Sequence, residues 1–180
     1  MIFNNLFTPY TYAFGFFVCF AFITIVVTFK IDNDSQTYCD NAVHEFVDQT
    51  RATGYISPQA YLEMCEKMNN TGNLYDIKLV HQSTKLTPYV DAAGNEKKGE
   101  FAEIYDAYYK EEILSVLFPT NTSFYGSYPL KNGDYIKVSY SLKEPTLASK
   151  IIGLISTHSI KTIYGSYGGY VGSTEEKGAF

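Results

Sequence analysis

Charged side chains are unevenly distributed along this chain, and the break separates two parts. Residues 1–29 contain no Asp, Glu, Lys, Arg or His, and every charged residue lies from Lys30 onward. The uncharged run 7–29 is 23 residues long. As a helix rising about 1.5 Å per residue it would extend roughly 34 Å, enough to cross a hydrocarbon core of about 30 Å. The pattern therefore predicts one transmembrane helix.

A cleaved secretory signal and a buried core helix are the alternatives to a retained membrane span. A signal peptide begins with basic residues and ends at a small-x-small site, and this stretch has neither feature. A buried helix of this length would be unusual in so small a domain. The apolar side chains expected to face lipid are Phe14, Phe16, Phe17, Phe20, Phe22, Ile23, Ile25 and Val26. Counting positive charges leaves the orientation of the span open, because Lys30 is the only basic residue near it.

The stretch that follows the span has helical periodicity. Tyr38, Ala42 and Phe46 recur every four residues, which places them on one apolar stripe of a helix. No Pro or Gly interrupts residues 16–53, so the membrane helix could continue outward as one rod, with a bend or fraying at 32–37. Gly54 is a suitable C-terminal stop.

Two further helices are predicted. In residues 57–72, Ser57 is a good N-cap and Pro58 fits the first helical position. The apolar face of this helix comprises Tyr61, Met64, Cys65 and Met68. Residues 101–118 are predicted as another helix because Pro119 follows directly. Its expected buried stripe comprises Ile104, Tyr108, Ile113, Val116 and Leu117.

Strand patterns occupy the remaining periodic segments. Residues 73–83 alternate, with Tyr75, Ile77, Leu79 and His81 on one face. Residues 132–144 combine an Asn-Gly-Asp turn with alternation, a hairpin-type signal, and 162–174 form the last predicted strand. The polar stretch 87–100 reads as an exposed loop and 146–157 as a short helix.

The order of elements predicts an α+β protein with a long N-terminal transmembrane and stalk helix. The small head should contain a mainly antiparallel sheet of three to four strands packed on helices. We expect four parts along the chain: 1–30 for the N-terminal segment and transmembrane helix, 31–56 for an outward stalk helix, 57–172 for the head, and 173–180 for a flexible tail.

Catalytic and cofactor motifs are missing from the sequence. His44, Glu45 and Asp48 could share a helix face, but three metal ligands on one solvated face are less expected than a plain polar face. Cys39 and Cys65 could meet between adjacent helices or could be two small buried residues. The net charge of −5 argues against a general affinity for nucleic acid. We therefore expect no catalytic residues, no metal and no cofactor, and not an enzyme.

Tyrosine is the most distinctive residue type in the head. The chain contains 17 tyrosines, and a Tyr-Gly alternation recurs at 124–128 and 162–174. Tyr105, Tyr108 and Tyr109 are expected at or near the core. The glycine-flanked residues Tyr125, Tyr128, Tyr164, Tyr167 and Tyr170 are candidates for an interaction edge, with ordinary strand packing as the equal alternative.

Several segments resemble a known family. The stretch 42–79, "AVHEFVDQTRATGYISPQAYLEMCEKMNNTGNLYDIKL", is similar to TadE-like, type IV pilin-related membrane proteins of Gram-positive tight-adherence-type and conjugative-element clusters. The distal pieces "YPLKNGDYIKV" and "IYGSYGGYV" resemble late strand motifs of that family. Where such pilins are cut before Phe and carry Glu at the fifth mature position, this chain has Gly15, Phe16 and then Phe20. We expect no cleavage at that place.

The resemblance implies a minor pilin or pseudopilin, a structural membrane subunit of a pilus-assembly or secretion apparatus. Its implied partners are the lipid bilayer, other pilin-like subunits in a homo- or hetero-oligomer, and membrane proteins of the assembly platform. Its head would lie outside the cytoplasm. The alternative function is a membrane-tethered extracellular binding module that uses the Tyr/Gly-rich edge.

Overall fold

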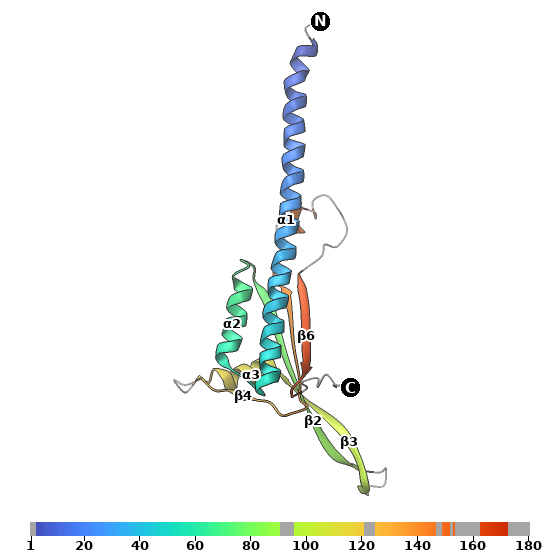
Figure 1. The fold of residues 1–180 in the computed structure, drawn as a ribbon. Helices are drawn as coiled ribbons and strands as arrows, with labels where there is room; N and C mark the ends of the chain where they lie inside the picture. The colour runs from blue at the N-terminus through green and yellow to red at the C-terminus, as the bar shows by residue number, and fades with distance from the viewer. Residues whose placement is uncertain are drawn as a thin grey trace, which may run out of the picture.

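The computed structural model describes residues 3–90, 96–120, 125–146, 149–151, 153 and 163–172. A long helix carries the N-terminus away from an α+β head, as predicted (Figure 1). This helix, α1 (Phe3–Thr53), is a single element of 51 residues. The bend expected at 32–37 is absent, since helical hydrogen bonding continues through the polar stretch. α1 ends where sequence predicted, at Gly54, whose φ of 75° suits a glycine.

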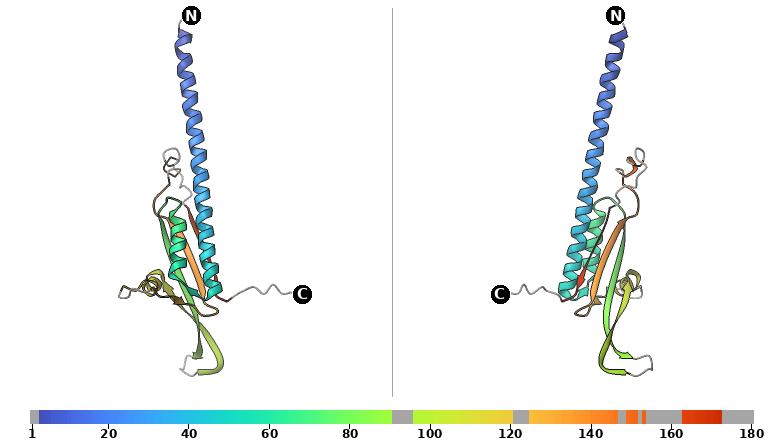
Figure 2. Two further views of the ribbon diagram at one scale, coloured as in Figure 1. Left: turned by 60° about the vertical axis from the view of Figure 1, so that its left-hand side comes forward. Right: turned by 90° about the vertical axis from the view of Figure 1, so that its right-hand side faces the viewer.

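The two halves of α1 lie in different surroundings. The first half projects alone, whereas the second half packs into the head through a buried stripe (Figure 2). The stripe consists of Cys39, Ala42, Val43, Phe46, Val47 and Thr50. The prediction for Tyr38 was wrong, because its ring is 68% exposed and Cys39 holds the buried place. Cys39 suits this site as a small side chain in a close-packed core.

The second helix, α2 (Pro58–Asn69), follows β1 (Tyr55–Ile56) and confirms the predicted capping. Ser57 Oγ accepts a hydrogen bond from the backbone N–H of Ala60 at 3.0 Å. The face of α2 that carries Tyr61, Met64 and Met68 is buried against α1 and the rest of the core. Cys65 is half-buried at the margin of that face.

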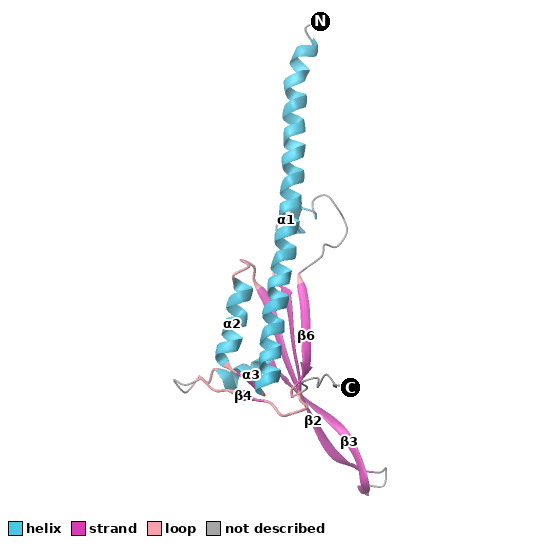
Figure 3. Ribbon diagram, in the orientation of Figure 1, coloured by secondary structure: helices cyan, strands magenta, loops and turns pink. Residues whose placement is uncertain are grey.

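A four-stranded antiparallel sheet forms the other layer, in the order β3-β2-β5-β6 (Figure 3). Its strands are β2 (Tyr75–Val90), β3 (Glu96–Tyr109), β5 (Tyr135–Leu142) and β6 (Tyr164–Tyr170). A short β4 (Tyr128–Pro129) pairs with β1 in a separate two-stranded sheet. The Asn-Gly-Asp turn therefore leads into β5 without forming the tight hairpin that the sequence suggested. The segment before the turn pairs with β1 instead.

Residues 101–118 are not one helix. The first nine residues belong to β3, and only α3 (Lys110–Leu117) is helical. The apolar positions of 101–109 fit either period, and pairing with β2 from Val80↔Tyr109 onward decides in favour of a strand. Ile113 and Leu117 are buried as predicted, whereas Ile104 and Val116 are exposed.

Residues 87–100 also differ from the exposed loop that was predicted. Thr87–Val90 still belong to β2 and residues 96–100 to β3, so the two strands form a long hairpin arm. β5 accompanies β2 only as far as Gln82↔Tyr135, and the arm projects beyond the sheet (Figure 1). Of the predicted helix 146–157, residues 149–151 and 153 are helical, and the remainder beyond Thr146 lies outside the described residues.

The core lies between the helices and one face of the sheet. The predicted alternation is confirmed in β2, where Ile77, Leu79 and His81 are buried. In β5 the buried positions are Ile136, Val138 and Tyr140. The opposite face of the sheet has no helix among the described residues, which matches the polar residues on alternate positions.

Candidate membrane anchor and the helix–strand seam

The first half of α1 presents its apolar side chains to the outside. Within the described residues, α1 is the one helix long and apolar enough to cross a membrane, and none of its apolar window is buried. Of the eight predicted lipid-facing residues, Ile25 is half-buried and the others are exposed; Phe20, for example, is 62% exposed. A continuous apolar surface of this kind is unfavourable in water and marks a lipid or protein contact.

The second half of α1 lies against the edge strand β6. We call this contact the α1–β6 seam; it comprises Gln36, Asp40, His44, Asp48 and Arg51 of α1 with Tyr164, Gly165, Tyr167, Gly169 and Tyr170 of β6. Alternate residues of β6 face opposite sides. Gly165, Tyr167 and Gly169 face α1, while Ser166 and Gly168 face away.

Two glycines permit the close approach between helix and strand. A Cβ atom on Gly165 would lie 2.5 Å from Oδ1 of Asp40 and 2.6 Å from the ring of Tyr140. A Cβ atom on Gly169 would lie 2.6 Å from Nε of Arg51. These distances are shorter than van der Waals contact, so a side chain at either position would have to displace Asp40 and Tyr140, or Arg51, from their places in the seam. Gly165 and Gly169 of "YGSYGGY" are thus explained by packing against α1.

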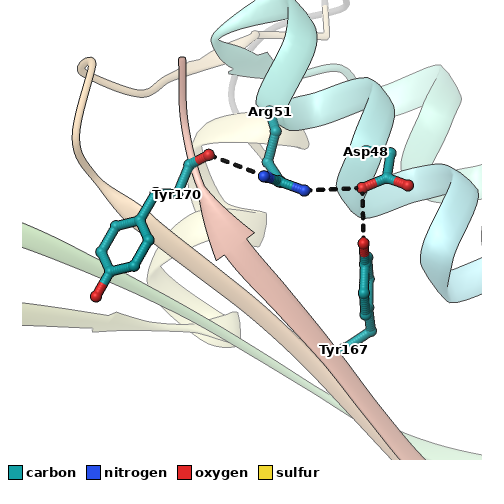
Figure 4. Close-up of polar contacts among 4 residues, drawn as sticks. All are labelled: Asp48, Arg51, Tyr167 and Tyr170. Atoms are coloured by element: carbon teal, nitrogen blue, oxygen red, sulfur yellow. Dashed lines mark hydrogen bonds and ion pairs between the residues drawn. The ribbon is translucent and has the colours of Figure 1, made fainter. Parts of the chain in front are cut away.

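Polar contacts hold the seam together near the C-terminal end of α1 (Figure 4). The hydroxyl of Tyr167 donates to Oδ1 of Asp48 at 3.1 Å, and Nη1 of Arg51 donates to the same oxygen at 3.1 Å. Nε of Arg51 donates to the backbone carbonyl of Tyr170 at 2.9 Å. The Tyr167 ring also stacks on His44, with centroids 3.8 Å apart. The bond to Asp48 raises the pKa of Tyr167, because it favours the protonated hydroxyl.

At the other end of the seam, near Gln36 and Asp40 of α1, the contacts involve Tyr140 of β5. Its hydroxyl donates to Oδ1 of Asp40 at 2.8 Å, and Nε2 of Gln36 lies 3.4 Å from the carbonyl oxygen of Tyr164. Burial raises the pKa of Tyr140, and the hydrogen bond to the Asp40 carboxylate raises it further. Tyr140 therefore remains a neutral donor at physiological pH. The seam runs over four helical turns, from Gln36 to Arg51.

The five candidate interface tyrosines do not share one edge. Tyr164 and Tyr170 are exposed on β6, whereas Tyr167 is half-buried in the seam. Tyr128 lies half-buried on β4, and Tyr125 is exposed beside Phe118, with ring centroids 5.4 Å apart. Their role in binding remains a prediction. Tyr105 and Tyr109 are exposed, contrary to expectation, and Tyr108 is half-buried.

A buried cluster around His81 was missed by the sequence reasoning, which placed this histidine on one face of a strand and gave it no partner. Nε2 of His81 lies 2.9 Å from Oδ2 of Asp134, and Nδ1 lies 2.9 Å from the hydroxyl of Tyr128. His81 is only 4% exposed. Its place on the same strand face as Ile77 and Leu79 was the available signal, because a buried imidazole requires polar partners.

The cluster connects three parts of the head through hydrogen bonds to both ring nitrogens of His81. Both ring nitrogens of His81 are already hydrogen-bonded, so the His–Asp pair acts as a brace between β2, β4 and the turn before β5. Burial alone would raise the pKa of Asp134, but hydrogen bonds from the backbone N–H of Lys131 and from His81 and Ser83 outweigh it and lower the pKa. Burial raises the pKa of Tyr128 to about 12, so its hydroxyl stays protonated.

The other candidate ligands have partners of their own. His44 stacks on Tyr167, Oε2 of Glu45 lies 2.6 Å from Nζ of Lys67 on α2, and Asp48 binds Arg51. No group of three or more metal-ligating side chains occurs in the part of the chain that the structure describes. Cys39 and Cys65 are free thiols. His158 lies outside the described residues.

Comparisons with protein-family models, with curated proteins and with solved structures found no match to this chain.

Replacing Gly165 tests the close approach of α1. Gly165→Ala should destabilise the head by about 1–3 kcal/mol, because the new methyl group collides with Asp40 and Tyr140. An alanine in a strand would otherwise be neutral or slightly stabilising relative to glycine. Denaturant unfolding of the full chain in detergent measures the change. Ser166→Ala, on the opposite face of the same strand, is the matched control and should leave stability nearly unaltered.

Removing the charge of Asp134 tests the brace. Its folded pKa is lowered, so the ionised carboxylate contributes stability above the unfolded pKa of about 3.9, and that contribution is lost as pH falls. Asp134→Asn should cost on the order of 1–3 kcal/mol at neutral pH. When the free energy of unfolding is measured as a function of pH, the difference between Asp134→Asn and wild type should become smaller below about pH 4. Asp106 is half-buried and forms a surface ion pair with Lys85, so Asp106→Asn should change stability little; an equal loss there would contradict the assignment.

Proposed function

We propose that this protein is a structural, pilin-like membrane subunit whose work is packing rather than catalysis. The supporting observation is that one unbroken helix serves two purposes. Its bare, apolar first half is suited to lipid or to neighbouring helices, and its second half is part of the core of the head. The resemblance of residues 42–79 and of the two distal strand pieces to TadE-like proteins points the same way.

Continuity between anchor and head supports a building block over a tethered receptor. A receptor module works well on a flexible linker, which lets it search for its ligand. Here no linker separates the two parts, and the α1–β6 seam fixes the head against the helix over four turns. Such rigidity suits a subunit that must present the same orientation in every copy of an assembly.

The partners in this proposal follow from the exposed surface of α1. Its apolar side chains would face lipid in the membrane and would contact equivalent helices of other pilin-like subunits once an assembly forms. Membrane proteins of an assembly platform would be the second class of partner. The head would lie outside the cytoplasm. The histidines His44 and His81, which are the natural candidates for acid–base chemistry, are both engaged in packing contacts, in accord with a non-catalytic role.

A charge in the middle of the span should impair the anchor. Phe20→Glu should oppose membrane insertion by roughly 2–3 kcal/mol, because a carboxylate in hydrocarbon is costly. The measurement is the fraction of full-length protein that remains in membranes after alkaline extraction. Phe20→Leu is the control and should insert like wild type. Equal membrane retention of Phe20→Glu would show that position 20 is shielded or that the span is misassigned.

Cross-linking between copies separates a packing subunit from a solitary tethered module. Cysteines placed one at a time along residues 14–27, in a chain that carries Cys19→Ala and Cys65→Ser and keeps the buried Cys39, should form inter-copy cross-links in native membranes. The yield should rise and fall with a period of three to four residues, since one side of each helix would face its neighbour. Cysteine at the exposed Glu144 of the head serves as a control for random collision. Absence of any periodic signal along the span would count against the subunit and favour the module.

A further inference from the structure

A second part of the chain lies at the level where α1 would leave the bilayer. We define the shoulder as Thr146, Ser149, Lys150, Ile151 and Gly153, the described residues between β5 and β6 that stand beside α1 rather than in the sheet (Figure 1). The backbone N–H of Lys150 donates to the carbonyl of Thr146 at 2.9 Å, so the shoulder begins with a helical turn.

A side-chain network attaches the shoulder to α1. The hydroxyl of Thr146 donates to Oδ2 of Asp32 at 2.6 Å, and its oxygen accepts from the backbone N–H of Ser149 at 3.2 Å. Thr146 and Ser149 are both buried, with 9% and 7% exposure. This burial is unusual so close to the bare half of α1. The hydrogen bond that joins the shoulder to α1 is therefore shielded from water by the surrounding structure.

Burial along α1 follows a stripe that includes the attachment point at Asp32. Ile25 and Thr28 are half-buried although their neighbours in the apolar run are exposed. With Asp32 and the buried Ser35 they recur at intervals of three or four residues, which places all four on one stripe of the helix. The covered stripe thus extends from the head past Lys30 and into the apolar run.

The height of the shoulder follows from helix geometry. Asp32 lies two residues beyond Lys30, about 3 Å along the axis. The headgroup layer on each side of the hydrocarbon core is roughly 5–7 Å thick. If α1 spans the bilayer with Lys30 at its boundary, Thr146 lies within that layer, and the covered residues Ile25 and Thr28 lie below it.

We propose that the shoulder is a second membrane contact, which lies in the headgroup layer beside α1 and binds lipid headgroups. This inference rests on the proposed membrane span and adds that the protein touches the bilayer at two places. Lys150 is exposed on the shoulder, and Lys30 and Lys143 are exposed on the neighbouring segments, while the carboxylate of Asp32 accepts the hydrogen bond from Thr146 and keeps its charge. Asp34 and Glu144 are the exposed acidic groups of the same region. The lysines supply the charge that headgroup phosphates bind.

The absence of tryptophan from the sequence allows a direct test with single introduced fluorophores. Full-length Ile151→Trp, Phe20→Trp and Tyr55→Trp are reconstituted into vesicles of phosphatidylcholine with phosphatidylglycerol. Lipids carry a spin label either near the headgroup or near the tail end. Phe20→Trp should be quenched more strongly by the deep label. Ile151→Trp should lose most of its emission with the shallow label, and Tyr55→Trp, at the far end of the head, should be quenched by neither.

The outcomes distinguish the two proposals. If Phe20→Trp is quenched while Ile151→Trp behaves like Tyr55→Trp, the shoulder is in water and this inference is overturned, but the span stands. If Phe20→Trp is not quenched, the membrane span itself is wrong. Lys150→Trp repeats the measurement at an exposed site, so that a packing defect in Ile151→Trp cannot mimic a negative result. Adding Lys150→Glu to Ile151→Trp should weaken the shallow quenching, whereas Lys150→Arg should preserve it.

Discussion

Close packing between α1 and β6 is the contact on which the rest of this structure depends. The second half of α1 can form part of the core only if the sheet holds it firmly. Gly165 and Gly169 make room for that approach, and Tyr167, Asp48 and Arg51 supply directional bonds across it. The tyrosines and glycines of this strand therefore have different tasks. Glycine sets the distance between the layers, and tyrosine provides apolar area with a hydroxyl that reaches a partner.

Elements with strong local signals were predictable. The long helix, the capped helix after Ser57 and the alternation that buries Leu79 and Val138 are all written in short stretches of sequence. The strand at 101–109 was not, because its apolar residues satisfy both periods and only pairing with β2 selects one. Long-range pairing also placed residues 87–90 and 96–100 of the polar stretch in paired strands. Hydrophilic composition alone could not reveal that.

The contacts that organise the head were the least accessible from sequence. His81 and Asp134 are 53 residues apart, and nothing local indicates that they meet. Which face of β6 lies against α1 depends on the order of the strands in the sheet. The alternation of residues along the strand does not predict that order. Tyr38 shows a smaller failure of the same kind, since a shift of one position along the helix moved Cys39 into the core instead. Local sequence patterns therefore predicted most of the elements, whereas the contacts within the head depend on pairing between distant segments.

The side-by-side arrangement of α1 and β6 has a mechanical consequence. A force that draws the head away from a fixed α1 acts along the helix axis and slides the helix lengthwise over the strand. The contacts of Gln36, Asp48 and Arg51 are then loaded together in shear rather than peeled apart one after another. The force needed to slide α1 over β6 is then the sum of the forces that these contacts withstand together. Tension along the molecule would accordingly be carried by the fold of the head itself.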